Sequence, residues 1–401
     1  MEMKLWTKNY SLLWLGQFIS QIGNRIYLMA LAWYFVAILH HDGGLLTLFI
    51  ISSLPSLLFG VFVGPLVERW NKKTVIIISD IISGLLTASL ALMMWTEHVH
   101  EPTIYVICFL LNVSNLFFSP SVNSILPAIL QRENYQKGTS MIKMIAFLGQ
   151  ILGAAVGGIL VGIWGVLLTI VINSVSFFIS AIAEMFITYQ PVIRRVKSTY
   201  IKDMKGGFSY LKQNVTIKRV LMLSIYTNLF LPVFVVFIPI FVNDMNLGAS
   251  HYGLADSAIP VGAVIISLFL SRYKLKVGNP IRLLAQGVLL LIACYLSIAL
   301  LHNYWLLLLC AVCYGISTNY ININVISYMM KTVDTAYMGR VFSLLESLSY
   351  ASISLSYVLA TVMSSKTNVY MVLAINACFL MVVVALSVIW SRPVNRKTIN
   401  T

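Results

Sequence analysis

Charged residues are scarce in this chain of 401 residues, and acidic residues are the scarcest. Only 10% of the residues are charged, with 13 Asp and Glu against 27 Lys and Arg, whereas 59% are hydrophobic. Soluble globular proteins carry about 25% charged residues. The scarcity excludes a soluble enzyme, because so few charges cannot cover a surface exposed to water. It also excludes a disordered chain, which requires low hydrophobicity. What remains is a protein that crosses a membrane several times.

Cysteine and the common catalytic motifs are scarce too. The five cysteines all fall within apolar segments, so that no disulfide framework is indicated. Cys310-x-x-Cys313 lacks the second pair of ligands that a structural zinc site needs. No HExxH, P-loop or nucleophile-elbow motif occurs. We therefore expect neither an enzyme nor an ATP-driven pump, no metal, and no cofactor beyond a proton gradient as the energy source.

Long apolar runs, in contrast, are abundant. A run of about 20 such residues can cross the hydrocarbon core, and it does so as an α-helix. We predict twelve crossings, with approximate limits 11–39, 44–67, 74–96, 103–126, 139–162, 165–188, 219–243, 251–271, 281–301, 303–328, 341–363 and 367–390. The fifth and sixth are so close that they could form one long helix.

The basic residues fall on alternate loops. All but two of the 27 Lys and Arg lie at the termini or in every second loop, and the exceptions are Arg25 and Lys366. Cytoplasmic loops carry such an excess of basic residues. The pattern predicts an even number of crossings, both termini in the cytoplasm, and a bacterial inner (plasma) membrane. It also assigns the net charge of +14 to topology, so that no nucleic-acid partner is expected.

A basic stretch divides the apolar runs into two sets of six. Pro55 in the second run and Pro260 in the eighth hold matching places in the two sets. Such internal repeats are typical of secondary transporters. We predict an all-α membrane protein with twelve helices in two pseudo-symmetric bundles. The expected parts are a first bundle over 1–190, a cytoplasmic linker over 191–218 and a second bundle over 219–401.

Motifs in both halves carry a family resemblance. Two of them are Gly64-Pro65-Leu66-Val67-Glu68-Arg69-Trp70-Asn71-Lys72-Lys73 and Gly149-x-x-x-Gly153-Ala154-x-x-Gly157-Gly158. The first resembles the signature G-x-L-x-D-R-x-G-R/K-R/K of the major facilitator superfamily, and the second resembles its antiporter motif, with Ala154 in place of Pro. Segments 21–25, 118–120 and 339–343 are similar to the macrolide-efflux branch of the drug:proton antiporters. The resemblance implies the twelve-helix fold and exchange against protons. No arginine lies between residues 103 and 126, so the proton relay that many drug antiporters build on one is not implied.

Arg25 is the basic residue predicted near the middle of a crossing. A charge at that depth is costly, so it must face protein or a wet cavity. Gln21 lies one turn away on the same helix face. We interpret Arg25 as a cavity cation that binds an anionic group of the substrate or acts on a carboxylate. The alternative is an ion pair that fixes the first crossing to its neighbour. No acidic residue is expected near Arg25 in depth.

Amide side chains on three further crossings complete the predicted substrate site. They are Asn112, Asn115, Asn228, Asn319 and Asn324, in addition to Gln21 and Arg25. Together they could bind a bulky amphiphile through hydrogen bonds. The alternative is hydrogen bonding between helices, worth about 0.6 kcal/mol for each bond in a membrane.

A second predicted group lies near the cytoplasmic ends of the helices. It comprises Glu68, Arg69, Asp80, Arg340 and Glu346. The acids Asp80 and Glu346 could carry protons, and the alternative is a gate network with the two arginines. Two more acids lie in or near apolar runs: Glu184 is expected at the membrane interface and Asp256 as a cap of the eighth crossing.

These patterns predict a secondary transporter that exports an amphiphilic, macrolide-like molecule by alternating access, in exchange for protons. An anionic metabolite or a carboxylate siderophore is the alternative cargo. A membrane sensor or enzyme without transport is the alternative from another class. The expected partners are the small-molecule substrate and the lipid bilayer, and we expect a functional monomer with no obligatory protein partner.

Overall fold

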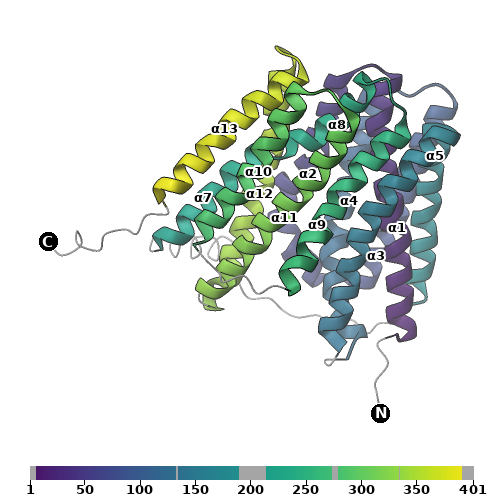
Figure 1. Ribbon diagram of the computed structural model, residues 1–401. Coiled ribbons are helices and arrows are strands. Elements are labelled where there is room, and N and C mark those ends of the chain that lie inside the picture. The colour runs from purple at the N-terminus through teal and green to yellow at the C-terminus, as the bar shows by residue number, and fades with distance from the viewer. Residues whose placement is uncertain (1–5, 132–133, 189–213, 273–278, 334, 391–401) are drawn as a thin grey trace. The chain divides into compact units, whose positions relative to one another are not determined.

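The computed structural model describes residues 6–131, 134–188, 214–272, 279–333 and 335–390 (Figure 1). Every regular element within these ranges is helical, which confirms the all-α prediction there. The helices are α1 (Lys8–Trp33) with its π-helical continuation η1 (Tyr34–Ile38), α2 (Asp42–Arg69), α3 (Lys72–Trp95), α4 (Glu101–Ile129), α5 (Tyr135–Met185), α7 (Val215–Phe230), α8 (Pro232–Asp244), α9 (Ala249–Arg272), α10 (Pro280–Leu300), α11 (Tyr304–Thr332), α12 (Thr335–Ser364) and α13 (Val369–Trp390).

Ten helical stretches of the described chain are long and apolar enough to cross a membrane. The fifth and sixth predicted crossings form one such stretch, because α5 covers both. Helix α1 is not among the ten, since its polar stripe lowers its hydropathy. The seventh predicted crossing consists of α7 and α8, which are separated at Leu231. Length and hydropathy alone therefore do not reproduce the predicted count of twelve.

The chain packs into two compact units. Unit 1 comprises residues 1–197 and 236–260, and unit 2 comprises residues 198–235 and 261–401. In unit 1, α5 packs against α1 and α3, and α4 packs against α2 and α3. In unit 2, α10 packs against α11 and α13, and α7 packs against α12. The predicted linker over 191–218 lies mostly outside the described residues, so the predicted domain limits stay a prediction.

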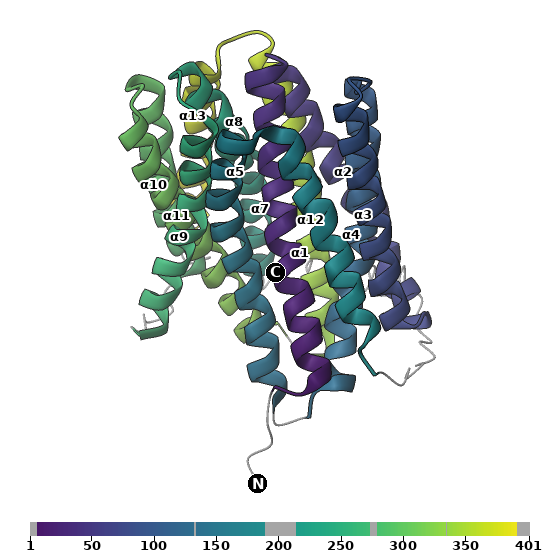
Figure 2. The same cartoon turned by 90° about the vertical axis from the view of Figure 1, so that its right-hand side faces the viewer.

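Helix α5 is broken at Gly165 into a first arm over 135–164 and a second arm over 166–185. The backbone of Gly165 has φ 78° and ψ 174°, in a region that side chains with a Cβ rarely adopt. Figure 2 shows α1, in dark purple, between the two arms. The break therefore allows one continuous stretch of chain to pack on both sides of α1.

We expect Gly165→Ala to destabilise the protein by about 1–2 kcal/mol, because the new Cβ opposes the positive φ. The matched control is Gly162→Ala, three residues earlier in the first arm, where φ is not positive and nothing lies within 4 Å of an added Cβ. The control should leave the melting temperature in detergent unchanged or raise it. An equal fall in melting temperature for both variants would contradict the explanation by the positive φ of Gly165.

Glycines bring α1 and α5 into close contact. An added Cβ would lie 3.1 Å from Gln21 Cβ at Gly149, and 2.9 Å from the carbonyl oxygen of Ile22 at Gly153. On the opposite side of α1, a Cβ at Gly16 would lie 2.9 Å from Ser180 Oγ in the second arm. Small residues let helix backbones approach closely in membranes. The glycines of the motif in the first arm therefore allow α5 to pack closely against α1.

Glycine also brings α5 close to α9 within unit 1. A Cβ at Gly158 would lie 2.7 Å from the carbonyl oxygen of Ala249 and 2.9 Å from the Cα of Gly253. A Cβ at Gly253 would in turn lie 2.9 Å from the Cα of Gly158. We call this the Gly158–Gly253 contact. The backbones of α5 and α9 are in direct contact here, and neither Gly158 nor Gly253 has room for a side chain.

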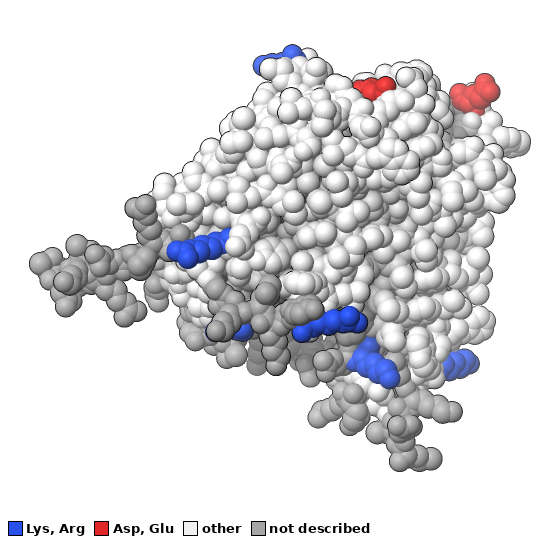
Figure 3. Space-filling model, in the orientation of Figure 1, with Lys and Arg blue, Asp and Glu red and all other residues white. Residues whose placement is uncertain are grey.

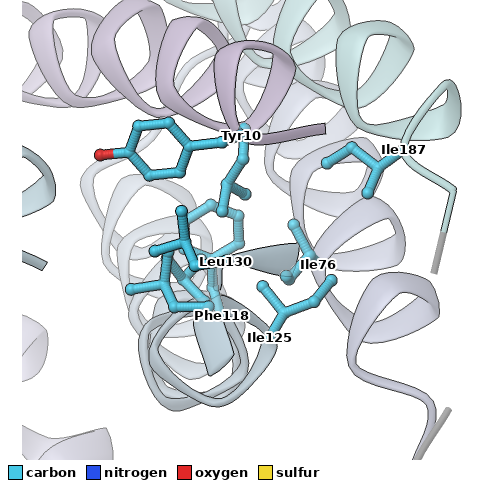
Figure 4. Packing of buried hydrophobic residues seen from close by; sticks show 9 residues of the cluster. Tyr10, Ile76, Phe118, Ile125, Leu130 and Ile187 are labelled. Atoms are coloured by element: carbon cyan, nitrogen blue, oxygen red, sulfur yellow. The ribbon is translucent and has the colours of Figure 1, made fainter. Parts of the chain in front are cut away.

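A buried apolar cluster fixes the first turns of α1. Figure 4 shows Tyr10 of α1 over Phe118, Ile125 and Leu130, which belong to α4 and its end, with Ile76 of α3 beside them. The Tyr10 hydroxyl donates a hydrogen bond to the carbonyl oxygen of Gly138 over 2.9 Å. The cluster therefore ties the start of α1 to α3, α4 and the first turn of α5.

Large apolar side chains are also exposed along the helices. Examples from both units are Leu85, Val106, Leu268 and Leu309. On the face shown in Figure 3, most of the surface carries no Lys, Arg, Asp or Glu. Monomeric soluble proteins rarely expose so much contiguous apolar surface. The exposed helix faces suit contact with lipid.

Candidate functional site

Unit 2 contains an open cavity of about 460 Å³ between α7, the start of α8, α11 and α12. We call it the unit 2 cavity. Its polar wall consists of Ser224, Thr227, Asn228, Tyr314, Thr318, Asn322, Ser349 and Tyr350. The other wall residues are aliphatic side chains and Pro232. None of the described lining residues is Lys, Arg, Asp, Glu or His. The cavity can therefore offer hydroxyl, amide and aromatic contacts.

Pro232 shapes the unit 2 cavity at the junction of α7 and α8. Proline lacks an N–H, so the chain cannot make the helical hydrogen bond from position 232 to the carbonyl of Asn228. Two buried tyrosines stabilise the junction: the hydroxyl groups of Tyr295 and Tyr314 donate to the carbonyl oxygen of Leu231 over 2.7 and 3.1 Å. The Asn228 side chain donates to Ser349 Oγ over 3.2 Å and so joins α7 to α12.

Unit 1 contains a second, much smaller cavity, which we call the unit 1 cavity. Its volume is about 30 Å³. A buried water needs roughly 10–15 Å³ measured in this way, so there is room for about two waters. The polar lining residues are Asn24, Ser79, Asp80, Ser83, Ser114 and Asn115. They come from α1, α3 and α4, and the cavity reaches the carboxyl group of Asp80.

Arg25 forms an ion pair with Asp256 of α9, within unit 1. The Asp256 side chain is 3% exposed and that of Arg25 22% exposed. Asp256 lies seven residues after Ala249, about 10 Å along α9. Two expectations are thus wrong: Asp256 does not cap the helix, and an acid does reach Arg25. The expectation compared only the depths of the two backbone positions in the membrane. The long side chain of Arg25 lets its guanidinium group reach an acid whose backbone lies at a different depth.

The other residues predicted to bind substrate have different surroundings. Asn228 lines the unit 2 cavity and Asn115 the unit 1 cavity. Asn112 and Asn324 donate to carbonyl oxygens of their own helices, those of Cys108 and Tyr320, over 2.9 and 2.8 Å. These two bonds are local, and neither residue lines a cavity described above.

Two predicted binding residues instead join helices. Asn319 of α11 donates to the carbonyl oxygen of Ala263 and to Ser267 Oγ, both over 2.7 Å, and so ties α11 to α9 in unit 2. Gln21 of α1 packs against Gly149 of α5. Asn319 matches the alternative interpretation, in which amide side chains form hydrogen bonds between helices, whereas the Gln21 contact is made by its Cβ and backbone.

The predicted gate and proton group is described only in part. Asp80 is buried in α3, and the side chains of Glu68, Arg69, Arg340 and Glu346 lie outside the described residues. Glu184, which was expected at the membrane interface, lies one residue before the end of α5 and is 0% exposed. It packs beneath Gly16 of α1, whose lack of a side chain lets the helix cover the acid.

Sequence reasoning missed several residues of the unit 2 cavity, among them Thr227, Thr318 and Ser349. On α11 the signal was present as spacing. Tyr314, Thr318, Ile321, Asn322 and Val325 follow one another at intervals that place them on one helix face, and all of them line the cavity. The sequence spacing identifies this face of α11 but does not show that it faces the cavity.

Long apolar helices with lipid-suited faces and internal, partly polar cavities define a helical membrane protein of the transporter class. The sequence matches the Major Facilitator Superfamily over residues 13–357. The chain therefore belongs to this family and is a multi-pass membrane protein. The family and its solved members are transporters and not enzymes, as the sequence predicted.

Similar proteins agree with this assignment. The chain is 21% identical to macrolide efflux protein A of Streptococcus pyogenes over 372 residues, 91% of each chain, which confirms the predicted resemblance to the macrolide-efflux branch. It is 20% identical to the staphyloferrin A transporter of Staphylococcus aureus, over 83% of this chain and 82% of that one. The crystal structure of the nucleoside transporter NupG superposes with a TM-score of 0.78 at 15% identity, covering 97% of this chain and 100% of NupG. This likeness confirms the predicted fold class.

Proposed function

We propose that the protein exports an amphiphilic, macrolide-like molecule without a strong anionic group, by alternating access and in exchange for protons. The observation that carries the proposal is the wall of the unit 2 cavity, which combines hydroxyl, amide and aromatic groups and has no charged residue among its described members. Its volume of about 460 Å³ lies within the usual range for small-molecule sites, roughly 300–1,000 Å³.

The chemistry of a macrolide fits this wall. A macrolide presents hydroxyl and carbonyl groups on a large apolar ring, and Asn228, Asn322 and Ser349 can pair with the polar groups. The Tyr314 and Tyr350 rings can pack against its apolar surface. The similarity to macrolide efflux protein A supports the same substrate class.

An anionic cargo, such as a carboxylate siderophore, is the second candidate. It is favoured by the similarity to the staphyloferrin A transporter, and it would need a cation in the binding site. Arg25 is the cation that the sequence offered for this purpose. Because Asp256 already compensates its charge, Arg25 supports an anionic cargo less than its position alone suggests.

A transport assay separates the two candidates. The purified protein is placed in liposomes that hold a pH gradient and a pH-sensitive dye, and erythromycin or citrate is then added. We expect erythromycin to dissipate the gradient and citrate to have no effect. Dissipation by citrate alone would favour the anionic cargo, and no flux of either compound would count against the proposed exchange.

The orientation is part of the proposal. We infer that the termini and the basic loops face the cytoplasm, since the excess of Lys and Arg marks the cytoplasmic side. A cysteine introduced next to Lys366 should react with a membrane-impermeant thiol reagent in intact cells. A cysteine introduced at Lys137 should react only after the cells are opened.

The two asparagines Asn228 and Asn324 provide a matched test of the binding site. Asn228→Ala should raise the KM for erythromycin about two- to tenfold, as expected for the loss of one neutral hydrogen bond of about 0.5–1.5 kcal/mol. Asn324→Ala should leave KM unchanged, because Asn324 bonds to its own helix and does not line the cavity. Equal effects of the two substitutions would contradict binding in the unit 2 cavity.

A further inference from the structure

Two acidic residues are buried side by side in unit 1. Asp80 of α3 is 2% exposed and Glu184 of the second arm of α5 is 0% exposed. The two carboxyl groups are near enough for their charges to interact. Lys73 Nζ donates to the carbonyl oxygen of Met185 over 2.8 Å, so the start of α3 and the end of α5 lie at the same level. Glu184 is therefore close to the end of α5. Asp80 interacts with Ser180, which precedes Glu184 by one helical turn on the second arm.

The groups that face this pair are neutral. From α1, Gln17 Nε2 donates to Glu184 Oε1 over 3.4 Å, and Gly16 covers Ser180 and Glu184. From α4, Ser114 and Asn115 line the unit 1 cavity beside Asp80. No basic side chain of the described residues is bonded to either acid.

Three basic residues on these elements have other partners. At the start of α3, Lys72 donates to the carbonyl oxygen of Trp70 and Lys73 to that of Met185. On α1, Arg25 pairs with Asp256. Asp80 Oδ2 and Glu184 Oε2 are buried and have no hydrogen-bond partner among the described residues. Each acid therefore has an oxygen whose bonding capacity is unused.

This arrangement cannot hold two negative charges at low cost. An ion buried without a partner costs several kcal/mol, and two carboxylates that share a site do not both ionise readily. A proton on one carboxyl group removes one charge and supplies an O–H donor.

We propose that Asp80 and Glu184 form a proton-binding dyad, which is the site through which the transporter couples to protons. The proposal deepens the proposed function, because it rests on proton exchange and names the residues that perform it. It assigns to Glu184 a role that the sequence alone did not suggest. It also chooses proton binding over the gate network for Asp80.

The unit 1 cavity borders Asp80 and has room for the water that would bring protons to the dyad. The dyad starts with one proton, on Glu184. Protonated water in the cavity gives a second proton to the Asp80 carboxylate and becomes neutral water. Glu184 then releases its proton to water near the end of α5. Transfer of the remaining proton breaks the O–H bond on Asp80, forms one on Glu184, and restores the starting state. The path uses no other titratable group of the described residues.

The first experiment measures proton binding without any substrate. Infrared spectra of the purified protein, recorded across a pH series, report the C=O stretch of protonated carboxyl groups. We expect a band that titrates in the wild type and is lost in the double variant Asp80→Asn/Glu184→Gln. In each single variant the midpoint of the remaining acid should shift from its wild-type value. Melting temperatures check that these isosteric variants are folded.

Glu101→Gln is the matched control for this experiment. Glu101 is partly exposed at the first turn of α4, where it pairs with His41, and it lies outside the dyad. Its replacement should leave the titrating band unchanged. An unaltered band in the double variant would overturn the dyad, as would single variants in which the other acid titrates as before.

The second experiment tests coupling in liposomes. Erythromycin added to the double variant should move without dissipating the pH gradient, whereas the wild type and Glu101→Gln should dissipate it. Wild-type proton flux that persists in the double variant would overturn the coupling role. If the wild type itself moves no erythromycin, the proposed substrate fails, and the infrared titration still decides whether the dyad binds a proton.

Discussion

Arg25→Met is expected to destabilise the protein by about 3–5 kcal/mol, because it leaves the buried Asp256 carboxylate without its partner. Replacing both members, as Arg25→Met/Asp256→Leu, removes the uncompensated charge along with the pair. Apolar replacements of a buried ion pair are often neutral, so the double variant should unfold near the wild-type temperature. Thermal unfolding in detergent measures the difference. A loss of stability in the double variant equal to the sum of the losses in the two single variants would show that the pair does not act as a unit.

The same two variants distinguish the two interpretations of Arg25. If Arg25 only fixes α1 to α9, transport of erythromycin should fall in the single variant and return in the double variant along with stability. If Arg25 contacts the substrate, transport should stay lost in the double variant although the protein is stable. The pairing with Asp256 leads us to expect recovery.

Gly158→Leu is expected to abolish transport and to cost about 1–3 kcal/mol, as overpacking does in a well-packed interior. The Gly158–Gly253 contact has no space for a side chain, since even a Cβ would meet the Ala249 carbonyl oxygen at 2.7 Å. Helices α5 and α9 would have to separate at this point.

Gly162→Leu is the control for this prediction. Gly162 lies one turn further along the same arm, and nothing is within 4 Å of an added Cβ there. Its replacement should preserve both the melting temperature and erythromycin transport. A similar loss for both variants would mean that α5 rejects any large side chain, whatever the local contact.

The sequence was sufficient to predict the fold class, because apolar runs of membrane length and alternating basic loops reflect local requirements of a bilayer. The spacing of Gly149, Gly153 and Gly157 is also typical of close helix packing, but the sequence does not identify α1 as the partner. The partners of buried charges could not be predicted in the same way. Asp256 reaches Arg25, and Glu184 is fully buried, because helices distant in sequence pack around them. Such pairings depend on tertiary packing and not on distance from the end of a helix.

The candidate binding site illustrates the same difference. Asn319 and Asn322 are three residues apart on α11, yet Asn319 bonds to α9 and Asn322 lines the unit 2 cavity. An amide side chain satisfies either environment, so residue type does not decide between them. The rotation of α11 decides, and it is set by the side chains packed around the whole helix.

The glycines along α1 have a mechanical consequence. Because contacts at Gly16, Gly149 and Gly153 leave no space between α1 and the two arms of α5, α1 cannot turn or slide between them without collision. These three segments must therefore move together. A displacement of residues 249–260 of α9 relative to them would have to separate the Arg25–Asp256 pair. In the proposed alternating access, a movement of this kind would have to include the energy of separating these two side chains.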